Sequence, residues 1–159
     1  GAKNNVFNSH VEFFSKMKKG TLYGLTPLVN ETACGPDFYE EAKKSGHYIE
    51  LDPAMSMEEA KEYANKMDVL YTDTWVDMEF FNNPAYQKQK EETLAKMMPY
   101  QLNGDFTKDS KAIVFHDMPM HVGFEISQDV VDKNLDHILD EAENRRHAEK
   151  AVMYTLLNS

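Results

Sequence analysis

The sequence predicts an α/β protein of one domain, in which an open, mainly parallel sheet lies between two helical layers as an α/β/α sandwich. Helical and extended segments alternate along the chain, which is typical of strands joined by helical crossovers. The run Ala112 to Phe115 is continuously apolar, as expected for a parallel strand buried on both faces. The chain has 159 residues, of which 42% are apolar, and this is enough to form one hydrophobic core.

The first third of the chain contains two helical patterns and two extended ones. Apolar residues at helical spacing predict a helix from Asn4 to Lys19, which Gly20 ends. The segment Thr21 to Thr26 favours a strand, and 29–35 is irregular. A second helix is predicted from Pro36, a residue that the first turn tolerates, to Gly46.

Helix and strand signals continue through the middle of the chain. The run His47 to Leu51 is expected to be extended. Ser56-Met57-Glu58-Glu59 matches a capping box and predicts that a third helix starts at Ser56. A strand is expected at Val69 to Tyr71, followed by a fourth helix from about Pro84 to Met98, which Pro99 ends.

The last third is predicted to alternate in the same way. After the strand Ala112 to Phe115, Ser127 is expected to cap a short helix through Val131. A last strand is predicted at His137 to Leu139, and a terminal helix is marked by Ala148 to Thr155. This order favours a Rossmann-like fold, and we find no internal repeat or linker.

Composition narrows the function classes. There are 17 Lys and Arg against 27 Asp and Glu, a net charge of −10. This balance argues against nucleic-acid binding and favours a small cationic or neutral partner. One cysteine, Cys34, cannot form an internal disulfide, and no apolar run reaches membrane-spanning length. We therefore expect a cytoplasmic protein with no membrane and no nucleic-acid partner.

Polar clusters follow the predicted strands, where open α/β sheets bind their ligands. They are Thr72 to Glu79, His116 to Pro119 and Asp140 to His147. A fourth candidate is Asn4-Asn5, within a segment that looks like a loop after a strand although no strand is predicted before it. We expect from this that the chain is part of a longer protein that also contains the first strand.

These clusters resemble motifs of the aspartate/ornithine carbamoyltransferase family, in its second, amino-acid-binding domain and nearest to the ornithine branch. The resemblance runs from Gly1 to about Leu157. Asn4-Asn5 matches the pair that opens the first helix, Asp73 to Glu79 matches Asp-x-Trp-x-Ser-Met-Gly, and His116 to Pro119 matches His-Cys-Leu-Pro. Two further matching phrases are Tyr100-Gln101-Leu102-Asn103 and Asp140-Glu141-Ala142-Glu143-Asn144-Arg145.

The resemblance implies transfer of a carbamoyl group from carbamoyl phosphate to an amine, with no cofactor and no metal. The family's carbamoyl-phosphate motifs, Ser-Thr-Arg-Thr-Arg and His-Pro-x-Gln, are absent from these 159 residues. The chain alone is thus expected to be inactive and to lack its carbamoyl-phosphate domain. The full-length protein is expected to form a homotrimer through that domain.

The resemblance also implies which residues form the site. The expected catalytic residues are His116, Asp117 and Arg145. The expected substrate-binding residues are Asn5, Asp73, Asp77, Met78 and Met118, and Asp117 is expected to face the amine as well.

Several positions depart from the family motifs and change the expected substrate. Asp77 replaces Ser, Glu79 replaces Gly, Asp117 replaces Cys and Met118 replaces Leu. An α-carboxylate about 5 Å from Asp77 would be repelled by roughly 3 kcal/mol at an effective dielectric constant of about 20. A diamine such as putrescine would therefore suit the site better than ornithine, unless Asp77 pairs with the α-ammonium group.

Other interpretations remain open for these residues. The same fold with a cation-binding pocket could serve as a non-catalytic binding domain. Asp73 and Asp77 could simply cap turns, and Arg145 could pair with Glu141 or Glu143 on a solvated helix. His116, His121 and Asp117 have too few clear ligands to predict a metal site.

Overall fold

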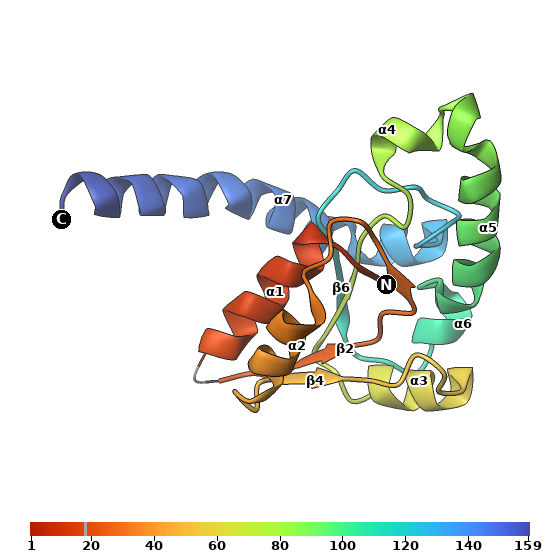
Figure 1. Cartoon of the computed structure of the whole chain (residues 1–159), viewed down its shortest axis with the longest axis horizontal. Helices are drawn as coiled ribbons and strands as arrows, with labels where there is room; N and C mark the ends of the chain where they lie inside the picture. Colours follow the sequence, from red (N-terminus) through yellow and green to blue (C-terminus); the bar gives the residue numbers. More distant parts are fainter. Residues whose placement is uncertain (18) are drawn as a thin grey trace. The chain divides into compact units, whose positions relative to one another are not determined.

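The computed structural model describes residues 1–17 and 19–159 and shows an α/β chain (Figure 1). It folds as two compact units, one containing residues 1–60 and 75–100, the other residues 61–74 and 101–159. Within the described residues the strands pair as three two-stranded ladders, and all three are parallel. The predicted α/β class with parallel strands is confirmed.

Two of the ladders belong to the first unit. They pair β1 (Ala2–Lys3) with β3 (Leu28–Val29), and β2 (Leu22–Gly24) with β4 (Tyr48–Glu50). The prediction that no strand precedes Asn4-Asn5 is wrong, because β1 ends directly before Asn4. Two residues form this strand, too few for a strand signal in the sequence.

Helices α1 (Asn5–Lys16) and α2 (Pro36–Lys43) pack against the β2–β4 pair (Figure 1). Asn4 caps α1, and its side chain accepts a hydrogen bond of 2.9 Å from the Phe7 amide. The core of this unit contains the buried residues Val11, Tyr39, Ala42 and Tyr48. The two helices are therefore held by their apolar faces, as the sequence pattern predicts.

The capping box at Ser56 is confirmed. The Ser56 amide donates to Glu59 Oε2 at 2.9 Å, and the Glu59 amide donates back to Ser56 Oγ at 3.2 Å. Helix α3 (Met57–Ala64) begins directly after it. The predicted helix at 84–98 is found as α5 (Gln87–Met97), with the 3-10 turns η1 (Pro84–Tyr86) and η2 (Met98–Tyr100) at its ends. A short helix, α4 (Met78–Phe81), precedes them.

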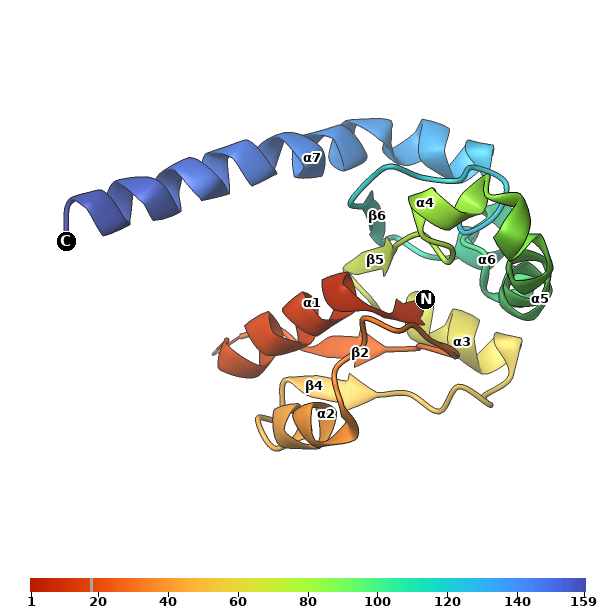
Figure 2. The ribbon, with the colours of Figure 1, turned by 45° about the horizontal axis from the view of Figure 1, so that its top comes forward.

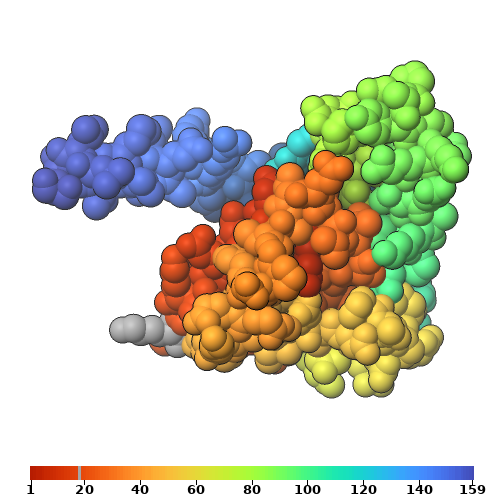
Figure 3. Space-filling model, in the orientation of Figure 1, coloured from red at the N-terminus to blue at the C-terminus, as the bar shows by residue number. Residues whose placement is uncertain are grey.

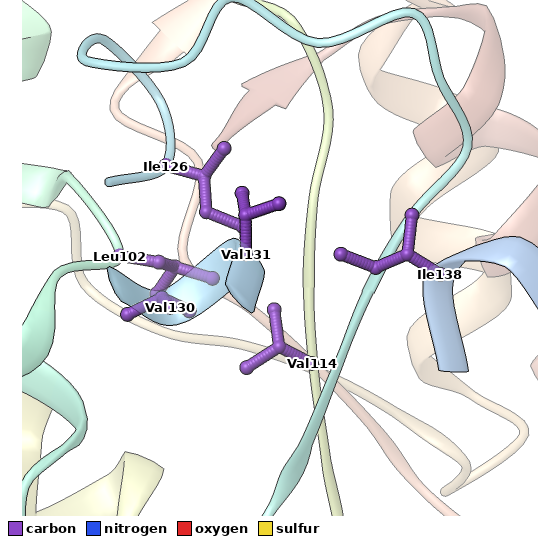
Figure 4. Packing of buried hydrophobic residues seen from close by; sticks show 6 residues of the cluster. All are labelled: Leu102, Val114, Ile126, Val130, Val131 and Ile138. Carbon is purple, nitrogen blue, oxygen red and sulfur yellow. The ribbon is translucent and has the colours of Figure 1, made fainter. Parts of the chain in front are cut away.

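The second unit pairs β5 (Val69–Thr72) with β6 (Ile113–His116), and the long helix α7 (Gln128–Leu157) packs against β6 (Figure 2). A short helix, α6 (Gly104–Thr107), also contacts α7. Six buried apolar side chains from the loops, β6 and α7 form its core (Figure 4): Leu102, Val114, Ile126, Val130, Val131 and Ile138. Asn134 of α7 adds a polar contact, because its Oδ1 accepts a hydrogen bond of 3.0 Å from the Val114 amide.

Helix α7 corrects the prediction for the end of the chain. The expected short helix, the strand at His137 to Leu139 and the terminal helix are one continuous helix. Val131 and Ile138 are seven residues apart, so both face the core, whereas Leu139 is half exposed. The three-residue segment from His137 to Leu139 was too short to distinguish strand from helix.

All residues from 142 to 159, which include the second half of α7, are exposed, and Figure 3 shows one face of this segment. Its exposed apolar side chains are Val152, Met153, Tyr154, Leu156 and Leu157. Within residues 1–17 and 19–159, none of the helices has the length and apolar character needed to cross a membrane.

Candidate functional site

The register of β5 and β6 brings two predicted site residues to one edge of the sheet. Thr72, the last residue of β5, is paired with His116, the last residue of β6. Asp73 and Asp117 follow directly, so both acids leave the ladder at its carboxyl end. The two motifs were predicted to follow strands of one parallel sheet, and the pairing of β5 with β6 confirms this for the main chain.

The two acids interact directly. Asp73 Oδ1 accepts hydrogen bonds from the Thr74 amide at 2.6 Å and from the Thr74 hydroxyl at 3.3 Å. Burial, the charge of Asp73 and a hydrogen bond between the two side chains together raise the pKa of Asp117 to about 7. Near neutral pH Asp117 is therefore protonated in part of the molecules.

A third acid and a phenol border this pair. Burial is the main cause that raises the pKa of Glu141, while the Tyr71 hydroxyl and the His116 backbone act in the opposite sense through hydrogen bonds. Burial also raises the pKa of Tyr71, and the nearby charges of Asp117, Glu141 and Asp73 raise it further. Tyr71 is thus a neutral hydrogen-bonding group among three acids, an arrangement that attracts a cation.

His116 is fully buried beside the acids, at 0% exposure. Its Nδ1 accepts a hydrogen bond of 3.0 Å from the Met118 amide, and its Nε2 lies 3.3 Å from Glu125 Oε1. Because an Nδ1 that accepts a hydrogen bond carries no proton, the ring proton lies on Nε2 and is donated to Glu125. Asp117 Oδ1 lies 3.7 Å from the same Nδ1.

The remaining predicted substrate-binding residues differ in position. Met118 directly follows Asp117 and is 41% exposed, with a φ angle of 51°. Asn5 is the first residue of α1, and Asp77 and Met78 lie at the start of α4, all in the other compact unit. Their contribution to the site of Asp73 and Asp117 stays a prediction.

Arg145 lies inside α7. The sequence had predicted a strand at His137 to Leu139 with Arg145 at the start of the following helix, and this prediction is wrong. Its side chain is 83% exposed, and its Nε donates to Glu149 at 3.0 Å. Arg146 pairs with Glu143 at 2.5 Å. The ion-pair interpretation of Arg145 therefore matches its surroundings, although its partner is Glu149 and neither Glu141 nor Glu143.

Sequence analysis did not select Tyr71, Glu125 or Glu141 as site residues. Tyr71 lies two residues before Asp73, and alternation along a strand offers a signal for it. Glu141 stands within the matched phrase that starts at Asp140. Glu125 has no such signal, because only the folded loop brings it to His116. Among residues 1–17 and 19–159, no three His, Cys, Asp or Glu side chains are arranged to hold a metal ion.

Comparison with known proteins agrees with these motifs. The family model described as aspartate/ornithine carbamoyltransferase, Asp/Orn binding domain, matches residues 1–156. The chain belongs to the aspartate/ornithine carbamoyltransferase family. It is 34% identical to the ornithine carbamoyltransferase of Chlorobaculum tepidum over 163 aligned residues, which cover 99% of this chain and 44% of that protein.

Solved structures of this family share the fold. The anabolic ornithine carbamoyltransferase of Campylobacter jejuni matches with a TM-score of 0.78 at 25% identity, covering 99% of this chain and 50% of that one. The ornithine carbamoyltransferase of Pyrococcus furiosus matches with a TM-score of 0.75 at 29% identity, and the match covers 96% of this chain and 46% of that one. The chain spans about half the length of these carbamoyltransferases.

Proposed function

We propose that this chain is the amine-binding part of an enzyme that transfers a carbamoyl group from carbamoyl phosphate to ornithine or to a diamine such as putrescine. The observation that carries the proposal is the pair Asp73 and Asp117 at the paired ends of β5 and β6. Family membership supports the reaction class, and the pair of acids supports a site for an amine at this edge of the ladder.

A protonated amine compensates the charge that this site concentrates. An ammonium group has three N–H donors, enough to contact both carboxyl groups and the Tyr71 hydroxyl oxygen together. Binding of a cation stabilises the ionised form of Asp117 and so favours release of the proton that the acid pair holds. We therefore expect amine binding to release protons near pH 7.

The raised pKa also suits Asp117 for the reaction. The bound ammonium group must first lose one proton to become a nucleophile. When the neutral amine nitrogen then attacks the carbonyl carbon of carbamoyl phosphate, a C–N bond forms, the C–O bond breaks, phosphate leaves with the bonding electrons, and the nitrogen loses a second proton. Once the bound amine is uncharged, a carboxylate whose pKa is raised by burial and by a neighbouring acid is a better acceptor for a proton than an ordinary aspartate. Asp73 would orient the amine, and Asp117 would accept the proton.

The acids favour a diamine over ornithine. Asp73, Asp117 and Glu141 surround Tyr71, and none of these four side chains offers a positive charge to a substrate carboxylate. Asp77 at the start of α4 would add a further negative charge if the substrate's distal end reaches it. Putrescine carries an ammonium at each end and no carboxylate, so it avoids that repulsion.

The proposal extends to the rest of the enzyme. Because the chain spans about half of its relatives, a further domain would bind carbamoyl phosphate. We also propose, from the family resemblance alone, that the complete protein is cytoplasmic and forms a homotrimer. Arg145 would contact carbamoyl phosphate from this side, and Asn5, Met78 and Met118 would complete the amine site.

Calorimetry on this chain tests the amine site. Titrations with putrescine and with ornithine are expected to show tighter binding of putrescine, and Asp73→Asn is expected to weaken it by at least about tenfold, or about 1.4 kcal/mol. Asp109→Asn, an exposed aspartate of the same unit, is the matched control. Absence of binding for both amines would contradict the proposal, and tighter binding of ornithine would contradict the diamine preference.

The replacement of the family's Cys by Asp117 favours one second candidate, a binding domain without catalysis. A longer protein that includes the carbamoyl-phosphate domain separates the two functions. We expect phosphate release when it is given carbamoyl phosphate with putrescine or ornithine. Amine binding without phosphate release would support the binding domain instead.

A further inference from the structure

Glu125 is the most completely buried acid of the second unit's site, at 1% exposure. Its Oε1 lies 3.3 Å from His116 Nε2 and also accepts a hydrogen bond from the His121 amide. Its Oε2 is buried without a hydrogen-bond partner among the residues that the structure describes. Glu125 Oε1 thus contacts both His116, at the end of β6, and His121, in the loop that follows β6.

The backbone holds Glu125 firmly in place. The Leu102 amide donates to the Glu125 carbonyl at 3.0 Å, and the next residue, Ile126, is fully buried in the core. The Ser127 amide donates to the Leu102 carbonyl at 3.0 Å. Because the main chain on both sides is anchored, the Glu125 side chain provides a fixed acceptor for His116.

His116, which is held by Glu125, in turn binds the main chain of Met118, the residue after Asp117. Its unprotonated Nδ1 accepts the Met118 amide at 3.0 Å, and Met118 has a φ of 51°, in the left-handed region that side chains other than glycine rarely adopt. Such a conformation persists only where surrounding contacts enforce it. The bond to His116 is the contact that the structure records for the Met118 amide.

We propose that Glu125 is a positioning residue of the amine site: it holds His116 as the Nε2–H tautomer, whose Nδ1 fixes the Met118 backbone and thereby presents Asp117 to Asp73. Both ring nitrogens of His116 are then occupied, so His116 also acts by positioning and does not touch the substrate. The consequence for the amine rests on the proposed function, whereas the tautomer does not.

The tautomer can be measured directly on this chain. Long-range 15N–1H correlation spectra of the histidine rings distinguish Nε2–H from Nδ1–H, and His116→Gln identifies the His116 signals among the six histidines. We expect His116 to be neutral and protonated on Nε2 in the native chain. An Nδ1–H ring or a doubly protonated ring at pH 7 would overturn the proposal.

Two variants test the role of Glu125. Glu125→Gln keeps an oxygen that can accept both hydrogen bonds, so the Nε2–H tautomer should persist. Glu125→Leu removes the acceptor, so the ring should become a mixture of tautomers. Glu149→Gln, an exposed glutamate on α7, is the matched control. A pure Nε2–H signal in Glu125→Leu would overturn the proposal, as would its loss in Glu125→Gln.

Amine binding gives the second readout. Putrescine should bind to Glu125→Gln within about threefold of the native dissociation constant and to Glu125→Leu at least about tenfold more weakly. Equal binding by both variants would overturn the positioning role. If the native chain binds no amine but shows the expected tautomers, the proposed function fails while the Glu125–His116 contact stands. If Glu125→Leu does not fold, the native tautomer and Glu125→Gln still decide.

Discussion

Thr72 of β5 and His116 of β6 are the last paired residues of a parallel ladder. The residues that follow them, Asp73 and Asp117, therefore leave the sheet at the same edge. Placing two carboxyl groups together is unfavourable for the free protein, because each disfavours ionisation of the other. The cost is visible in the raised pKa of Asp117. Stability that is given up in this way is typical of a ligand-binding site.

The first prediction concerns the pH dependence of stability. Since the folded-state pKa of Asp117 is about 7 and its ordinary value is 3.8, the folded chain binds the proton more tightly than the unfolded chain. The contribution of Asp117 is therefore most favourable below about pH 4 and is lost as the pH rises to about 7. Asp117→Asn should be stabilised relative to the native chain as the pH rises, by at most about 4 kcal/mol at pH 8.

Urea unfolding at pH 4 and pH 8 measures this difference. Asp136→Asn, at an exposed position of α7, serves as the matched control for removal of one negative charge. A stability difference between Asp117→Asn and the native chain that is the same at both pH values would show that Asp117 ionises as freely as an exposed aspartate.

The second prediction concerns substrate choice. Asp77 precedes α4 and makes no side-chain capping bond, while its carbonyl accepts from the Phe80 amide at 2.9 Å. Asp77→Ser should therefore fold normally. By removing a negative charge, it should shift the ratio of dissociation constants by about tenfold toward ornithine and away from putrescine. Calorimetry with both amines measures the ratio, with Glu79→Gln as control; an unchanged ratio would place Asp77 outside the site.

The third prediction tests the continuous helix α7. Ile138 is 0% exposed and Leu139 is 49% exposed. Ile138→Ala should lower the free energy of unfolding by about 2–5 kcal/mol, because it removes buried methyl groups and leaves a cavity. Leu139→Ala, its neighbour, should have a much smaller effect, since alanine is the best helix former. Chemical unfolding checks both, and similar losses for the two variants would be inconsistent with this helix face.

The fourth prediction concerns Arg145. Its side chain is 83% exposed and pairs with Glu149 along one helix face, an arrangement that contributes little to stability. Arg145→Ala should leave putrescine binding to this chain within about twofold, as should Arg146→Ala. In the longer protein, Arg145→Ala alone should reduce phosphate release if Arg145 contacts carbamoyl phosphate. A tenfold loss of amine binding by the isolated chain would instead place Arg145 in the amine site.

Local signals predicted much of the fold. Asn4, Pro36 and Ser56 mark the starts of three helices, because capping and proline chemistry act within one turn. The strand predicted at His137 to Leu139 failed for the opposite reason. Whether this segment is helix or strand depends on the packing of Ile138 in a core with Val114, and these two residues belong to elements distant in the sequence.

The site was predictable where it follows the strands. The position of Asp73 and Asp117 at neighbouring strand ends was predictable, because parallel strands place their carboxyl ends together. Their role in binding stays a prediction. Glu125 was not, because its contact with His116 depends on how the intervening loop folds back. The surroundings of Arg145 were not predicted, because it lies inside α7 and the strand expected before it at His137 to Leu139 is part of the same helix.

The spacing of the ladder has a consequence for the length of the substrate. Neighbouring strands lie about 5 Å apart, so the main chain sets the separation at which Asp73 and Asp117 emerge. One ammonium nitrogen that replaces the hydrogen bond between the two side chains would contact both acids. In the proposed amine site, only one ammonium group of a diamine would therefore bind here, and selection by carbon-chain length would depend on the residues that contact its opposite end.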